Sequence, residues 1–127
     1  MDAQRLKQIP VFAALDDDTL RSVATFATET SVPAGKHLLN EGDYAYELMA
    51  IEEGEAEVVR GGERLAVLGP GDFFGEMALL EKTLRTASVI AMTPMRLLTL
   101  SHWDLKRLGP ALDTILQTLE ERKRENA

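Results

Sequence analysis

The sequence of 127 residues contains no cysteine, which excludes disulfide bonds, thiolate metal ligands and cysteine nucleophiles. It contains only two histidines, His37 and His102, too few for a histidine-rich metal centre. No apolar run approaches the roughly 20 residues of a membrane helix, and the N-terminus has no apolar signal core. We therefore expect a cytoplasmic protein with no membrane contact by this chain.

Basic side chains are also scarce. The chain has 14 Lys and Arg against 21 Asp and Glu, which gives a formal net charge of −7. Nucleic-acid-binding proteins normally carry a basic surface, so we expect no nucleic-acid partner. The length and the hydrophobic content of 45% indicate one globular domain over residues 1–127.

Glycine is nearly absent from both ends of the chain, because eight of the nine glycines lie between Gly35 and Gly75. Glycine marks turns, so this distribution predicts helices in residues 1–30, a β region in residues 31–100 and helices again in residues 101–127. The expected strands are residues 37–39, 46–51, 55–60, 63–68, 86–91 and 95–100. Short strands at this spacing are typical of a sandwich, roll or barrel.

Three successive aspartates at residues 16–18 allow two interpretations. A calcium site would need further oxygen ligands at loop spacing, which the sequence does not supply. The better interpretation makes Asp16 the N-cap of a helix and places the next two carboxylates in its first turn, beside the positive end of the helix dipole. We expect no metal site.

Ser101, His102 and Asp104 contain the residue types of a catalytic triad. At this spacing they would point in different directions from a helix start, so they cannot relay one proton. Ser101 is expected instead to be an N-cap, with Asp104 completing a capping box. Trp103 beside them is expected to anchor in the core. No catalytic residue and no enzymatic activity are predicted.

The most informative stretch, residues 69–89, contains a glycine-rich turn, an apolar helix candidate and then an arginine. Its glycines follow a GxGxxxG spacing, which does not match the dinucleotide fingerprint GxGxxG. A helix that starts near Glu76 would offer free N–H groups to an anion, and Arg85 can bind phosphate oxygens through its planar fork. The Glu76 carboxylate would accept hydrogen bonds from sugar hydroxyls. A glycan, a nucleotide or a sugar phosphate would fit this description.

Residues 75–80 (GEMALL) and 85–89 (RTASV) resemble the phosphate-binding cassette of cyclic-nucleotide-binding domains. This family includes parts of protein kinase A regulatory subunits, catabolite-activator-type transcription factors and cyclic-nucleotide-gated channels. The resemblance covers nearly the whole chain, including a helical element at residues 9–15. It implies an eight-stranded antiparallel β-roll, or jelly roll, with an N-terminal helical element, a cassette at residues 74–87 and a C-terminal helix pair.

The resemblance also assigns roles to individual residues. Glu76, helped by the Gly75 backbone, would accept a hydrogen bond from the ribose 2′-hydroxyl, and Arg85 would pair with the cyclic phosphate. Backbone N–H groups near Ala78 and Thr86 would complete the phosphate cradle. The other expected ligand contacts are Met77 and Ala87 in the cassette, Val58 and Leu68 on strands beside the base, and Leu119, Arg122 or Lys123 in a lid formed by the last helix.

The function implied by the resemblance is a regulatory sensor that binds cAMP or cGMP, uses no further cofactor and signals to an unidentified effector. The module is expected to stand alone or to be excised from a larger protein, with no helix-turn-helix after the last helix. Two alternatives stay open: a β-roll interaction domain that binds no nucleotide, and a small metal-dependent enzyme on a cupin-like roll. The presence of both Glu76 and Arg85 argues against the first, and the two scattered histidines argue against the second.

Overall fold

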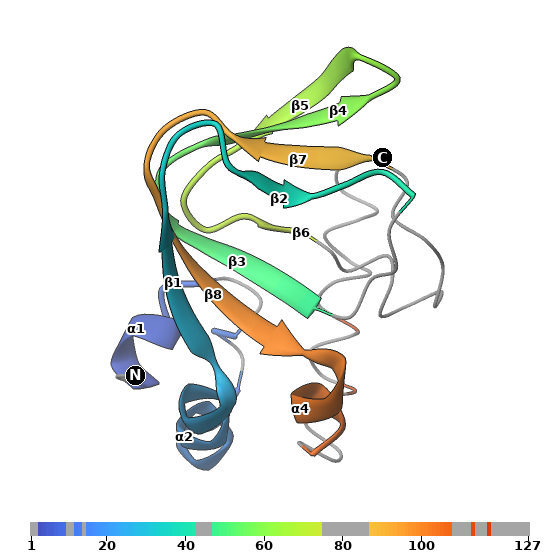
Figure 1. Ribbon diagram of the computed structural model, residues 1–127. Coiled ribbons are helices and arrows are strands. Elements are labelled where there is room, and N and C mark those ends of the chain that lie inside the picture. The colour runs from blue at the N-terminus through green and yellow to red at the C-terminus, as the bar shows by residue number, and fades with distance from the viewer. Residues whose placement is uncertain are drawn as a thin grey trace.

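The computed structural model describes residues 3–9, 12–13, 15–42, 47–74, 87–107, 113 and 117. The described helices are α1 (Ala3–Leu6), α2 (Asp17–Phe26) and α4 (His102–Lys106). The strands are β1 (Thr28–Val32), β2 (His37–Leu39), β3 (Glu47–Glu53), β4 (Ala56–Arg60), β5 (Glu63–Leu68), β6 (Phe73–Phe74), β7 (Ser88–Ala91) and β8 (Met95–Ser101). Figure 1 shows these elements in space.

The eight strands form two antiparallel sheets of four strands each. Sheet A has the order β1-β8-β3-β6, and sheet B has the order β2-β7-β4-β5. Along the chain, β1, β3 and β6 of sheet A are each followed by a strand of sheet B, and β4 and β5 follow one another within sheet B. This arrangement confirms the predicted β-roll. Of the predicted C-terminal helix pair, the described residues include only α4, and the rest of that prediction lies outside them.

The six predicted strands are all present, with bounds that agree to within two residues. The prediction of helices throughout residues 1–30 is wrong at its end, because β1 begins at Thr28. In β1, Thr28, Thr30 and Val32 are β-branched residues at every second position, which favours an extended chain. The two-residue strand β6 was not predicted either.

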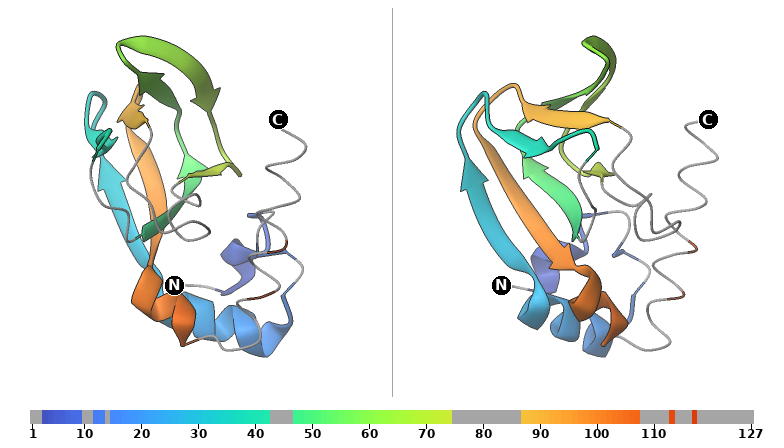
Figure 2. Two further views of the ribbon diagram at one scale, coloured as in Figure 1. Left: turned by 90° about the vertical axis from the view of Figure 1, so that its right-hand side faces the viewer. Right: turned by 45° about the vertical axis from the view of Figure 1, so that its right-hand side comes forward.

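Helices α1 and α2 pack against the outer face of sheet A. In α2 the buried side chains are Leu20, Val23 and Ala24, at the spacing of one helical face. Figures 1 and 2 show the described helices gathered at one end of the roll and the β4–β5 hairpin at the other. This helix–sheet core consists mainly of Leu6, Ile9, Phe12, Leu20, Val23, Leu48, Ala50, Leu98 and Leu100.

A second core fills the space between the two sheets. Alternation along β3 and β8 sends Ile51 and Leu97 to this inner face, while their neighbours Ala50 and Leu98 face the helices. The inner core consists of Ile51, Ala56, Phe74, Val89, Ala91, Met95 and Leu97. β3 and β8 of sheet A are therefore buried on both faces, whereas most of β1 is exposed.

The predicted helix caps are confirmed. Asp16 accepts a hydrogen bond from Thr19 N at 2.7 Å, and Ser101 Oγ accepts one from Asp104 N at 3.1 Å. The prediction for Trp103 is wrong, because this residue is 66% exposed. The Lys106 ammonium instead lies over its indole ring, 5.3 Å from the ring centroid, in a cation–π contact. Both side chains stay at the surface.

Candidate functional site

Two predicted base contacts, Val58 and Leu68, lie on neighbouring strands of sheet B and pack against the inner core. Val58 lies opposite Val89 of β7, and Leu68 lies opposite Ala56 of β4. Both side chains are half-buried. The structure therefore brings these two residues together on one apolar wall inside the roll, as a base contact requires.

The structure also positions both flanks of the predicted cassette. Phe74 ends β6 opposite Met49 in sheet A, and Ser88 begins β7 opposite Val59 in sheet B. Ala87, a predicted ligand contact, is half-buried immediately before β7. The chain thus leaves one sheet before the cassette and joins the other sheet after it. The remaining predicted contacts, Gly75, Glu76, Met77, Ala78, Arg85, Thr86, Leu119, Arg122 and Lys123, lie outside the described residues.

A network of hydrogen bonds holds the turn that precedes the cassette. Gly71 N donates to Ile51 O at 2.9 Å, and Ile51 N donates to Asp72 O at 2.8 Å. Within the turn, Gly69 N donates to the Asp72 carboxylate at 2.9 Å. These bonds fasten the turn to β3 and so fix where β6 begins.

The other flank is fastened by a side chain that sequence reasoning did not select. Ser88 Oγ accepts a hydrogen bond from Glu41 N at 3.0 Å. This bond joins the segment after β2 to the first residue of β7. No local sequence pattern indicated it, because the two residues are 47 positions apart.

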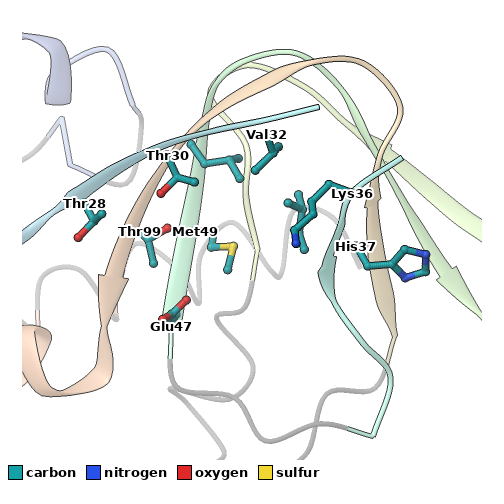
Figure 3. A pocket seen from close by; sticks show the side chains of 10 residues that line it. Thr28, Thr30, Val32, Lys36, His37, Glu47, Met49 and Thr99 are labelled. Carbon is teal, nitrogen blue, oxygen red and sulfur yellow. The ribbon is translucent and has the colours of Figure 1, made fainter. Parts of the chain in front are cut away.

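A cavity of about 290 Å³ opens between β1 and β2, where the edges of the two sheets face each other (Figure 3). Its polar lining includes Thr28, Thr30, Lys36, Glu47 and Thr99. Val58, Leu68 and Ala87 do not line it. The cavity was not predicted, because β1, which lines it, was not predicted. The alternation of threonines in residues 28–32 was the signal that could have revealed both.

A metal site and a membrane-spanning helix each place requirements on the described residues. Among these residues, no three His, Asp or Glu side chains lie close enough together to hold a metal. The aspartates at residues 16–18 serve the helix start instead, where Asp17 also pairs with Lys7 at 3.1 Å. Within the same residues, no helix is long and apolar enough to cross a membrane.

Residues 29–109 match the family model described as the cyclic nucleotide-binding domain. The chain belongs to this family. The matched region begins in β1 and includes all of sheet B, both cassette flanks and the cassette itself. The predicted family is therefore confirmed, and its signature residues lie in the segment that connects the two sheets.

Named relatives agree with this assignment. The cAMP-dependent protein kinase regulatory subunit of Schizosaccharomyces pombe is 36% identical over 110 residues, which cover 85% of this chain and 27% of that protein. The chain spans less than a third of the length of the first curated relatives that it matches.

Solved structures share the fold. The regulatory domain of Toxoplasma gondii PKA, crystallised with cAMP, matches with a TM-score of 0.74 and 31% identity over 84% of this chain and 42% of that chain. The N-terminal domain of a transcriptional regulator from Streptomyces coelicolor A3(2) matches with a TM-score of 0.78 and 32% identity. That match covers 99% of this chain and 95% of the other.

Proposed function

We propose that this domain binds a cyclic nucleotide, cAMP or cGMP, and acts as a non-catalytic regulatory sensor in the cytoplasm. The observation that carries the proposal is the cassette sequence, residues 75–80 and 85–89, within the matched family region. The inner wall formed by Val58 and Leu68 supports it, since a purine base needs an apolar surface beside a phosphate site. The cAMP bound by the Toxoplasma gondii relative supports the same ligand class.

Each part of the ligand has a proposed partner. Arg85 binds the cyclic phosphate with its planar fork, and Glu76 accepts a hydrogen bond from the ribose 2′-hydroxyl. Val58 and Leu68 contact the base. The phosphate carries the ligand's only net charge, and the net charge of −7 on the protein opposes its approach. We therefore expect Arg85 to contribute more to affinity than any other side chain.

Isothermal titration of the wild type and of Arg85→Ala with cAMP and cGMP tests the proposal. Loss of a charge-assisted contact should weaken binding roughly 100-fold or more, and Arg85→Lys should recover only part of the loss. Arg21→Ala is the matched control, because Arg21 lies on the exposed side of α2 and pairs with Asp18. A folded wild type that binds neither nucleotide would favour the interaction-domain alternative, and unchanged affinity in Arg85→Ala would refute the site.

We propose further that the Thr86 hydroxyl influences the choice between cAMP and cGMP. A guanine in the syn conformation presents a 2-amino group that can donate to this hydroxyl, and adenine has none. One such bond is worth about 0.5–1.5 kcal/mol, so Thr86→Ala should weaken cGMP binding several-fold more than cAMP binding. Equal weakening of both ligands would assign the hydroxyl to the phosphate instead.

The last helix is proposed to close over the ligand and to pass the signal to an unidentified effector. Leu119, Arg122 and Lys123 are the proposed lid residues. A ligand shifts a conformational equilibrium only through contacts that differ between the two states. Removal of residues 120–127 should therefore weaken nucleotide binding and leave the roll folded. Hydrogen exchange in residues 110–125 should slow on addition of nucleotide, and unchanged exchange would contradict closure.

A further inference from the structure

Ser88 holds the first residue of β7 from both sides. On one side, Ser88 pairs with Val59 of β4 in the backbone ladder of sheet B. On the other side, the described ladder between β2 and β7 ends with Leu39 opposite Val89. Beyond that pair, the Ser88 side chain makes a further tie, because Ser88 Oγ accepts a hydrogen bond from Glu41 N at 3.0 Å. One hydroxyl therefore fastens the start of β7 to the segment that leaves β2.

The face on which Ser88 lies decides how it can act on a ligand. Its neighbour Val89 is buried in the inner core, opposite the proposed base contact Val58. Side chains alternate along a strand, so the Ser88 side chain belongs to the outer face of sheet B. The hydroxyl therefore does not reach a nucleotide that contacts Val58 on the inner face. Any influence of Ser88 on such a ligand has to pass through the backbone.

The sequence just before Ser88 carries the proposed phosphate contacts. Arg85 precedes Ser88 by three residues, with Thr86 and Ala87 between them. Three residues of extended chain span at most about 11 Å, so a displacement at the start of β7 has only a short way to travel to the arginine. An arginine fork binds phosphate oxygens through two parallel N–H groups, and this geometry tolerates little misalignment.

We propose that Ser88 is a positioning residue for cyclic-nucleotide binding, an inference that rests on the proposed function. By accepting the hydrogen bond from Glu41 N, Ser88 holds the start of β7 in one place before the ligand arrives. Less ordering of the residues around Arg85 is then left for the ligand to bring about. A site that is ordered in advance binds more tightly, because the cost of ordering it is not subtracted from the binding free energy.

The roll itself does not depend on this bond. Glu41 is exposed, so a water molecule can replace the Ser88 hydroxyl at its N–H group. The backbone pair of Ser88 with Val59 also stays in place when the hydroxyl is removed. Substitution of Ser88 should therefore change the ligand-binding segment more than it changes the fold.

Thr93 supplies a matched control beyond the other end of β7. Thr93 Oγ1 accepts a hydrogen bond from Glu55 N at 3.0 Å, so it makes the same kind of tie at the same distance as Ser88. It also donates to Pro94 O at 3.1 Å, so the fold loses at least as much when this hydroxyl is removed. Both Ser88 and Thr93 are half-buried. Only Ser88 lies next to the cassette.

Titration of the wild type, Ser88→Ala, Ser88→Thr and Thr93→Ala with cAMP tests the proposal, and thermal unfolding confirms that each variant is folded. Ser88→Ala should weaken cAMP binding about three- to tenfold, the range that one neutral hydrogen bond can supply. Ser88→Thr keeps the hydroxyl and suits a strand, so it should bind like the wild type. Thr93→Ala should do the same. Wild-type affinity in Ser88→Ala, or an equal loss in Thr93→Ala, would overturn the proposal.

A double-mutant cycle tests whether Ser88 acts through Arg85. In the Arg85→Ala background, Ser88→Ala should cause no further loss of cAMP affinity, because the side chain that it positions has been removed. An equal loss in both backgrounds would show that Ser88 supports the site in some other way, and it would refute the positioning role.

A measurement without ligand separates this proposal from the proposed function. NMR relaxation of the backbone amides gives the order parameters of residues 85–87 in the free proteins. These should fall in Ser88→Ala and keep wild-type values in Ser88→Thr and Thr93→Ala. Unchanged order parameters in Ser88→Ala would overturn the positioning role even if cAMP binds. A wild type that binds neither cAMP nor cGMP would refute the proposed function itself, and the order parameters would then decide separately whether Ser88 orders residues 85–87.

Discussion

Arg5 Nη2 donates to both carboxylate oxygens of Glu52, at 2.7 Å each, and Arg5 Nε lies 3.2 Å from Glu52 Oε2. The same guanidinium contacts Glu29 Oε1 through Nη1 at 2.6 Å. The hydrogen bond to Glu52 is the largest cause of the raised pKa of Arg5. Because Arg5 lies on α1 while its partners lie on β3 and β1, one side chain ties the N-terminal helix to two strands of sheet A.

A double-mutant cycle with Arg5→Ala and Glu52→Ala should give a favourable coupling free energy in urea unfolding. The comparison pair is Arg21–Asp18 on α2, whose side chains are 67% and 89% exposed. Arg5 and Glu52 are only 32% and 15% exposed, so water screens their attraction less. We expect the coupling of Arg5 with Glu52 to be the larger by several-fold. Equal couplings would show that the helix is held by apolar packing alone.

Gly54 should tolerate substitution worse than the glycines at which an added Cβ would meet no atom within 4 Å, namely Gly35, Gly42, Gly61, Gly62 and Gly69. Its φ is +93°, and an added Cβ would lie 2.5 Å from Pro94 O and 2.8 Å from Met95 Cγ. The left-handed conformation and the collision with backbone act together, so Gly54→Ala should destabilise the domain by about 2–4 kcal/mol. The free energy of unfolding in urea measures this loss.

Gly42→Ala is the matched control for the glycine prediction. Gly42 has nearly the same φ of +88°, and an added Cβ there would meet no atom within 4 Å. Only the conformational term of about 1–2 kcal/mol should remain. Similar losses at both positions would mean that the Pro94 turn moves aside at little energetic cost.

Most of the strands were predictable because glycine-containing turns mark where they begin and end in the sequence. The hairpin of β4 and β5, for example, was evident from Gly61 and Gly62 between two period-two segments. β1 was missed because it follows α2 after one residue, with no glycine between them. Its alternating threonines carry a weaker signal than a turn, and they face a cavity that only the folded register creates.

The candidate site also contains features that the sequence predicted and features that it did not. Val58 and Leu68 were predicted as base contacts from the family resemblance, and the structure shows that both pack against the inner core; their contact with a base stays a prediction. Trp103 was wrongly predicted to be buried. A large aromatic residue at a helix start usually packs in the core, and the sequence alone does not show which side of α4 faces the sheets. The ties made by Ser88 and by Arg5 join residues 47 positions apart, a separation at which single-sequence patterns carry no information.

Asp16 should make the domain sensitive to acid. The hydrogen bonds from Thr19 lower the pKa of Asp16 below its ordinary value of 3.8. The pKa of Asp16 is therefore lower in the folded state than in the unfolded state. The stabilisation that the ionised Asp16 cap gives the folded state is fully present above the unfolded-state pKa, and it is lost as pH falls through the folded-state pKa. Asp16→Asn keeps a cap acceptor and cannot titrate. Its urea midpoint should therefore fall less than that of the wild type between pH 5 and pH 3, and parallel curves would contradict the assignment.

Glu76 should select ligands that carry a free 2′-hydroxyl. When a ligand lacks that donor, the carboxylate loses its hydrogen-bond partner and the water that formerly solvated it, so the loss exceeds that of a neutral contact. We expect 2′-deoxy-cAMP to bind the wild type at least tenfold more weakly than cAMP, and the ratio of the two affinities to approach one in Glu76→Ala. Glu81→Ala, a neighbouring carboxylate with no assigned ligand contact, should keep the wild-type ratio. Isothermal titration of the three proteins with both ligands measures these ratios. Equal wild-type affinity for the two ligands would refute the proposed contact between Glu76 and the ribose 2′-hydroxyl. It would not affect the proposed phosphate contact of Arg85, which the titration of Arg85→Ala tests separately.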